Sequence, residues 1–131
     1  MKSAIITRVD PRLDLTVHTF EGAITSQDII GTIEEYYRGR PTSNVVWDYA
    51  EAEFDQCGEE NLKSIVMAAS KHAWSTSNAK SFKSALILPG DPQFAIGRMF
   101  ETFAELENTS TQIQSFRSMT EAKQWLGVKA K

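Results

Sequence analysis

The feature of this 131-residue sequence that most constrains its fold is a regular change of hydrophobic period along the chain. Residues 4–9 are rich in β-branched side chains, and residues 13–20 alternate strictly, with Leu15 and Val17 on one side and His18 and Phe20 on the other. The turn at 10–12 carries Asp and Pro, which favour the tight reversal of a hairpin. The pattern predicts two antiparallel strands at the start of the chain.

After the hairpin, the period switches repeatedly between strand and helix. Short apolar runs at 44–49, 84–88 and 112–116 predict three further strands, and helical spacing predicts helices over 25–38, 59–74, 91–106 and 119–126. The near-continuous Val-Val-Trp of the third strand is typical of a central strand covered on both faces. The order β-β-α-β-α-β-α-β-α predicts a single α/β domain over 1–131, with a mixed, mostly parallel five-stranded sheet.

The helix boundaries carry their own signals. Thr25 or Ser26 is the expected cap of the first helix, Asp91 precedes a proline at the start of the third, and Ser118 opens a capping-box pattern before the last. The third helix is expected to bury one apolar stripe, which comprises Ile96, Met99, Phe100, Phe103 and Leu106.

Charge and composition exclude several classes of protein. Fourteen basic and seventeen acidic residues give a net charge of −3, which argues against nonspecific nucleic-acid binding. A single cysteine, Cys57, excludes an internal disulfide and a cysteine-rich zinc site, and we expect no cofactor or metal. No apolar run is long enough to cross a membrane. The start of the chain runs directly into strand-like sequence without a signal peptide, so we expect a cytoplasmic protein.

Four stretches of the chain resemble a known family. They are Val17–Gly22, Asn44–Asp48, Gly97–Glu101 and the segment from Phe116 to Leu126. With the order of elements, they resemble the STAS domains of sulfate transporters and anti-sigma-factor antagonists. The chain is more closely similar to the bacterial SpoIIAA-like group, which is also compared with CRAL-TRIO lipid-binding domains. The likeness covers nearly the whole chain, and its short motifs are mostly structural.

The resemblance also implies a difference. STAS antagonists carry an Asp-Ser-Ser/Thr-Gly turn, at which a partner kinase phosphorylates a serine. The best counterpart here is Asp55-Gln56-Cys57-Gly58, which keeps the Asp and the Gly but has no hydroxyl. The resemblance therefore implies that the phosphorylation switch is absent.

Several side chains are candidates for chemistry. Asp48 lies at the carboxyl end of a predicted strand and could bind a cation, although ordering a loop through backbone N–H groups is the favoured interpretation. Asp48 and Asp55 could form an acid/base pair, but nothing in the spacing brings them together. Cys57 at a helix start would have a lowered pKa. His72 lies too far along the same helix to activate Cys57, and a lone strand histidine such as His18 is usually structural.

Other residues are candidates for binding. Met67 and Trp74 lie seven positions apart, away from the expected core stripe of the second helix. They predict either an exposed apolar patch or packing under a loop or against the sheet edge. Arg98 is expected beside an exposed Phe94, where it either pairs with a neighbouring acid or contacts an anion or partner. Arg117 follows the last strand, at the sheet edge where open α/β sheets bind ligands.

Three functions remain open from the sequence. The favoured one is a non-catalytic regulatory or protein-interaction module, which binds a protein partner and for which a homodimer is plausible. The second is a small apolar or lipid-like ligand binder, with a pocket lined by aromatic residues: Tyr36, Tyr37, Trp47, Phe94, Phe100 and Phe103. The third is an enzyme that uses Asp48, Asp55 or Cys57.

Overall fold

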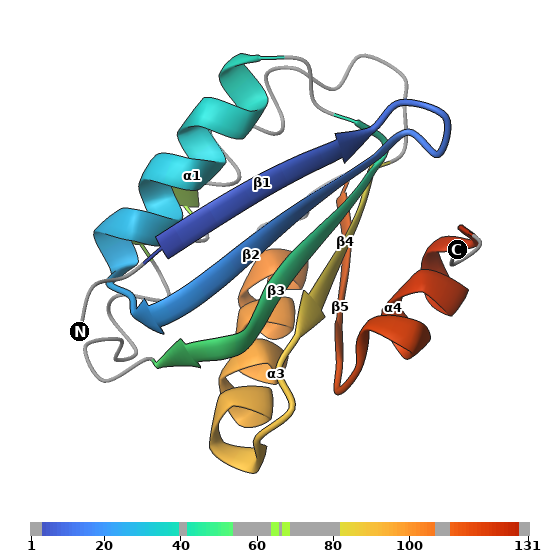
Figure 1. Ribbon diagram of the computed structural model, residues 1–131. Helices are drawn as coiled ribbons and strands as arrows, with labels where there is room; N and C mark the ends of the chain where they lie inside the picture. Colours follow the sequence, from blue (N-terminus) through green and yellow to red (C-terminus); the bar gives the residue numbers. More distant parts are fainter. Residues whose placement is uncertain are drawn as a thin grey trace.

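The computed structural model describes residues 4–39, 42–53, 64–65, 67–68, 82–106 and 111–128 (Figure 1). Its strands are β1 (Ala4–Asp10), β2 (Leu15–Ala23), β3 (Asn44–Glu53), β4 (Phe82–Ile87) and β5 (Thr111–Phe116). They form one five-stranded sheet in the order β1-β2-β3-β4-β5. β1 pairs with β2 antiparallel, and every later pair is parallel. The predicted α/β class and the mixed, mostly parallel sheet are confirmed.

Three helices are described in full: α1 (Ser26–Arg38), α3 (Asp91–Leu106) and α4 (Met119–Leu126). Thr25 caps α1 in a complete capping box with Asp28, and Ser118 caps α4. Gly127 ends α4 at a φ of 77°, a left-handed conformation that glycine adopts without strain. Of the helix expected over 59–74, residues 64–65 and 67–68 are helical, and the others lie outside the described residues.

The helices are divided unequally between the two faces of the sheet. α1 and α3 cover one face and α4 lies against the other (Figure 1). The reason is topological: right-handed crossovers between successive neighbouring strands keep their helices on one side, and only the helix after the last strand is free to cross over. Two separate apolar clusters follow, a larger one with Phe20 and Trp47 under α1, and a smaller one with Val46 and Leu126 under α4.

Several boundaries differ from the predictions, and β2 runs over Leu15–Ala23 rather than 13–20. β3 continues to Glu53 although Glu51 and Glu53 are acidic, because its backbone stays paired with β2 and only Ala52 between them is buried. β4 begins at Phe82 rather than Ser84, since Lys83 already pairs with Asn44.

The expected stripe of α3 is wrong at Met99, which is exposed. The helix instead turns Gly97 toward the sheet. A Cβ atom at Gly97 would lie far inside van der Waals contact with Leu88 Cδ1 and with Ser115 Oγ, so the missing side chain permits the close approach of α3 to β4 and β5. With Gly97 inward, Met99 falls on the far side of the helix.

Candidate functional site

The carboxyl ends of β4 and β5 are joined by Arg117. Its guanidinium donates to the Pro89 carbonyl at 3.1 Å and to Asp91 Oδ1 at 2.6 Å, and it lies 4.4 Å from the centre of the Phe94 ring. Phe94 is half-buried against the larger core cluster, so the expectation that it is exposed is wrong. The guanidinium covers its ring and connects the loop before α3 to the loop before α4. Arg117 thus orders these loops with donors that would otherwise be open to an anion.

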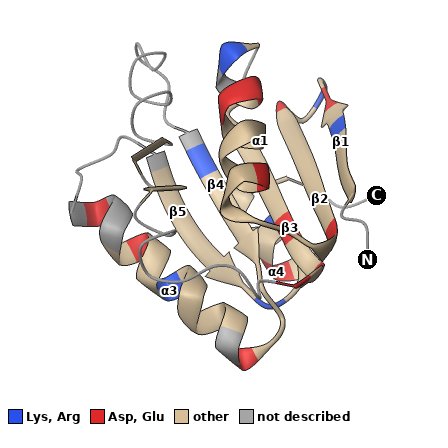
Figure 2. Ribbon diagram, turned by 90° about the vertical axis from the view of Figure 1, so that its left-hand side faces the viewer, with Lys and Arg blue, Asp and Glu red and all other residues tan. Residues whose placement is uncertain are grey.

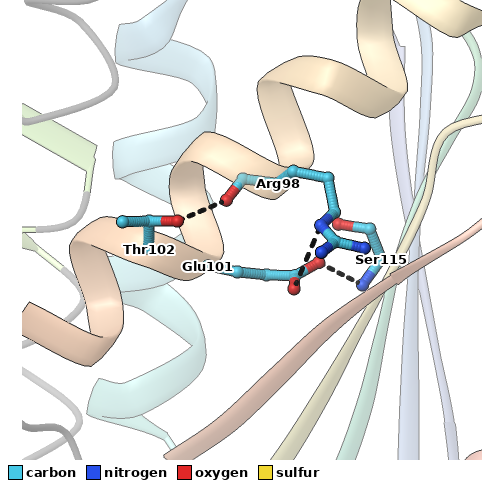
Figure 3. Close-up of polar contacts among 4 residues, drawn as sticks. All are labelled: Arg98, Glu101, Thr102 and Ser115. Carbon is cyan, nitrogen blue, oxygen red and sulfur yellow. Dashed lines mark hydrogen bonds and ion pairs between the residues drawn. The ribbon is translucent and has the colours of Figure 1, made fainter.

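Arg98 lies farther along α3, a helix on which Figure 2 shows basic and acidic positions interspersed. Its Nε is 3.9 Å from Glu101 Oε1, and Glu101 Oε2 accepts the backbone N–H of Ser115 at 2.7 Å (Figure 3). Thr102 donates to the Arg98 carbonyl at 3.1 Å. Arg98 therefore pairs with a neighbouring acid, which was one of its two predicted roles. Phe94, which was expected beside Arg98, contacts Arg117 instead.

The contact between Glu101 and Ser115 has a consequence for the sheet. β5 is an end strand, and the Ser115 N–H that Glu101 accepts points away from β4, toward the open edge. Unpaired N–H groups on an end strand are templates for pairing with another chain. The Glu101 carboxylate occupies this one, so α3 closes part of the β5 edge.

Asp48 lies inside β3, because the strand continues past it. Its Oδ1 accepts the N–H of Ala50 at 3.0 Å, beside a shift of register between β2 and β3 at Thr19 and Glu21. In this bulge two residues of β3 oppose one of β2, and the carboxylate satisfies a backbone donor there. The interaction agrees with the structural interpretation of Asp48, as an organiser of backbone.

The remaining sequence candidates divide into two groups. Met67 is 66% exposed, as expected for a residue outside the core stripe, whereas Ile65 beside it is buried. Asp55, Cys57 and Trp74 lie outside the described residues, and so does the turn compared with the STAS phosphorylation site. Among the described residues, no group of three or more His, Cys, Asp or Glu side chains could hold a metal ion.

His18 is buried under α1 among aromatic side chains. The sequence indicated a structural role for this histidine but not its neighbours. His18 is 3% exposed, stacks on Trp47 at 4.4 Å between ring centres, and meets Tyr36 edge-on at 5.2 Å. His18 Nδ1 shares a hydrogen bond of 2.9 Å with Thr7 Oγ1, while Nε2 has no partner within the described part of the chain. Burial lowers the pKa of His18 to about 4 and raises the pKa of Tyr36.

Among the described side chains, four of the aromatic residues expected to line an apolar pocket pack within the core or against it. Tyr36 and Trp47 are core side chains, and the Tyr36 hydroxyl donates to the Thr42 carbonyl at 2.9 Å. Phe94 and Phe100 pack against the same cluster. The side chains of Tyr37 and Phe103 lie outside those described.

A groove lies on the opposite face, between the β1–β2 hairpin and α4. It has a volume of about 430 Å³ and an apolar floor of Leu13, Leu15 and Val17. Its rim carries the cationic side chains Arg8, Arg12 and Lys123 together with the acidic Asp10, which lies 3.9 Å from Arg12 Nε. The groove exists because the single short helix on this face leaves the hairpin side of the sheet uncovered.

β1 is the opposite end strand, and it is exposed along nearly its whole length. Every residue from Ala4 to Val9 is exposed, and three of these are large and apolar: Ile5 at 38%, Ile6 at 42% and Val9 at 58%. Successive strand residues point to opposite faces, so these side chains lie on both faces of the sheet margin. Among the strands described, β1 has a partner on one side alone.

Comparison with solved structures identifies the architecture. An uncharacterised protein of the DUF3478 family from Shewanella loihica PV-4 matches with a TM-score of 0.57 at 18% identity, over 95% of this chain and 93% of that one. It is described as having a SpoIIAA-like fold. The fold of this chain is SpoIIAA-like. The anti-sigma-factor antagonist SpoIIAA itself, in its unphosphorylated form, matches with a TM-score of 0.52 at 11% identity, over 95% of this chain and 98% of that one.

The SpoIIAA-like fold is therefore established by shape, and it confirms the resemblance seen in the sequence. No protein-family model matches the sequence, and no curated protein matches it. In the described part of this SpoIIAA-like chain, no helix is both long and apolar enough to cross a membrane.

Proposed function

We propose that this SpoIIAA-like domain is a non-catalytic, cytoplasmic regulatory module that binds a protein through β1. The observation that carries the proposal is the exposed end strand, with Ile5, Ile6 and Val9 open to solvent beside a backbone edge with which no other described strand pairs. Such an edge binds an extended segment by main-chain hydrogen bonds, while the alternating side chains supply specificity. The structural neighbour SpoIIAA is an antagonist of another protein, which supports a protein-binding role.

The charged residues first considered for binding support this choice of surface. Arg98 pairs with Glu101, and Arg117 is tied to Asp91 and Phe94, so binding a partner through either guanidinium would compete with an internal contact. The exposed apolar side chains of β1 could contact a partner without breaking an internal ion pair. Met67, which the sequence analysis placed in a possible apolar patch of the second predicted helix, is also exposed and is a second candidate for contact with a partner.

Site-directed photo-cross-linking tests the proposal. A photo-reactive phenylalanine derivative is placed at Val9 and, as a control, at the exposed Gln124 of α4, and the protein is expressed in its host. We expect a discrete adduct from position 9, mapping to one extended segment of a protein and lost when Ile6→Lys is added, and no adduct from position 124. Equal adducts from both positions, or an adduct insensitive to Ile6→Lys, would contradict binding at β1.

A second candidate function rests on the groove beside α4. Asp10 offsets Arg12 on its rim, so the apolar floor and the two further cations, Arg8 and Lys123, suit an amphipathic anion, a molecule with an alkyl body and one negative head group. Native mass spectrometry with dodecanoate as the probe tests this function, with dodecyltrimethylammonium as the matched cation. Binding of dodecanoate that weakens in Lys123→Ser is the expected result. Equal binding of the two probes would reject the groove as an anion site.

A further inference from the structure

We propose that the segment received by β1 is β1 of a second copy of this chain, paired antiparallel about a two-fold axis at Thr7. The inference rests on the proposed function, because it names the partner of the same edge. The two end strands of the sheet, β1 and β5, differ in how far their outer edges are covered, and β1 is the less covered of the two. Glu101 occupies an outward N–H of β5, whereas β1 is exposed over six consecutive residues.

The sequence of β1 selects the register. In a continuous sheet, residues opposite one another must point to the same face, so the axis must pass through a residue position. An axis at Thr7 uses all seven residues of the strand and places Ile5 opposite Val9 of the second copy. These two side chains, 38% and 58% exposed in the single chain, then cover each other.

The neighbouring registers are worse because of charge and of apolar cover. An axis at Arg8 places the two Arg8 side chains directly opposite each other, and like charges in that position are destabilising. An axis at Ile6 places Ile5 opposite Thr7 and gives Val9, the most exposed of the three large apolar side chains, no apolar partner within Ala4–Asp10. With the axis at Thr7, Arg8 faces Ile6 and Asp10 faces Ala4, so no like charges meet.

The unequal margins also set where assembly stops. A two-fold pairing uses the same patch on both copies and is closed after two chains. The margins left at the ends of the joined sheet are both β5, where a further strand would have to displace Glu101 from Ser115. One strand pair is smaller than the roughly 1,200–2,000 Å² of a standard stable interface, so we expect reversible association with a dissociation constant on the order of micromolar.

Disulfide trapping tests the register. Two proteins are made in a Cys57→Ser background, one with Ile5→Cys and one with Val9→Cys, and they are oxidised separately and as a mixture. Opposite residues in an antiparallel pair have Cα atoms about 4.5–5.5 Å apart, within reach of a disulfide. Identical positions are four residues apart along the ladder, about 13 Å, and are out of reach. We expect a cross-linked dimer in the mixture and none in either protein alone.

Sedimentation velocity on the unmodified sequence supplies an independent measurement. We expect the dimer fraction to rise with concentration, and Val9→Lys to weaken association by about tenfold or more, because two lysines would enter each interface. Gln124→Lys, which adds the same charge on α4, should leave association unchanged.

The outcomes separate this inference from the proposed function. A monomer at every concentration together with no disulfide in the mixture overturns self-pairing, and equal disulfide formation in the separate proteins overturns the register. If photo-cross-linking from position 9 then reaches a different protein, binding through β1 stands while self-pairing is rejected. If both experiments fail, both proposals are rejected.

Discussion

Lowering the pH from 6.5 to 4 is expected to reduce the free energy of unfolding by about 3 kcal/mol through His18 alone, the largest effect of a single group that we expect. His18 has its ordinary pKa of 6.5 when unfolded, and burial lowers its pKa to about 4 in the folded protein. The unfolded chain therefore binds a proton first as the pH falls. The stability is fully present above pH 6.5, declines between pH 6.5 and 4, and levels off below that window.

The cause of the effect is the surroundings of the ring. Trp47 and Tyr36 shield His18 from water, and Tyr36 stays neutral in this window because burial raises its pKa. The hydrogen bond to Thr7 Oγ1 offers no negative charge to an imidazolium. A protonated His18 would be a buried, unpaired cation, which is unfavourable.

Denaturant unfolding at closely spaced pH values measures this dependence. His18→Gln is the control, since its amide can bond to Thr7 and does not titrate. The difference in unfolding free energy between the two proteins should fall by about 3 kcal/mol across the window. Subtracting one curve from the other removes the carboxylates, which titrate in both proteins. Parallel curves would mean that His18 is solvated.

Gly97→Ala is expected to lower the free energy of unfolding by about 1–3 kcal/mol, even though alanine is the better helix former. The added methyl group would meet Leu88 Cδ1 and Ser115 Oγ well inside van der Waals contact. The Ser115 hydroxyl can rotate, but Leu88 is buried and cannot move aside freely. Relief of the clash therefore requires α3 to move away from β4 and β5, which loosens the packing and the contact of Glu101 with Ser115.

Gly31→Ala is the matched control for this substitution. Gly31 lies inside α1, and a Cβ atom added there would have no atom within 4 Å, so alanine should raise stability by about 0.5–1 kcal/mol. The two glycine variants should thus change stability in opposite directions when both are unfolded in urea. A stabilised Gly97→Ala would show that α3 does not approach the sheet so closely.

The sequence predicted the sheet well because its signals are local. The alternation in residues 13–20 and the caps at Thr25 and Ser118 all act within a few residues. Local signals could not predict where β3 ends or that Met99 is exposed. They depend on pairing with β2 and on the depth at which Gly97 meets two strands, which are tertiary contacts.

The candidate surfaces were harder to predict for the same reason. The sequence offered Arg98 and Phe94 as neighbours, but the turn after β5 brings Arg117 to Phe94 instead. His18 was correctly placed opposite Leu15 and Val17, yet its stacking on Trp47 required knowledge of which strand lies beside β2. Predicting the exposure of β1 required the strand order, because a run of β-branched residues is typical both of end strands and of central strands.

The strand order has a consequence for how the chain acquires its structure. Each strand lies beside the strand that precedes it, so the sheet needs no late insertion of one strand between two others. Every contact between strands closes a single hairpin or crossover, which keeps the relative contact order low for a parallel sheet and favours rapid folding. The hairpin can form first as the chain leaves the ribosome, and each later segment can dock on a completed neighbour.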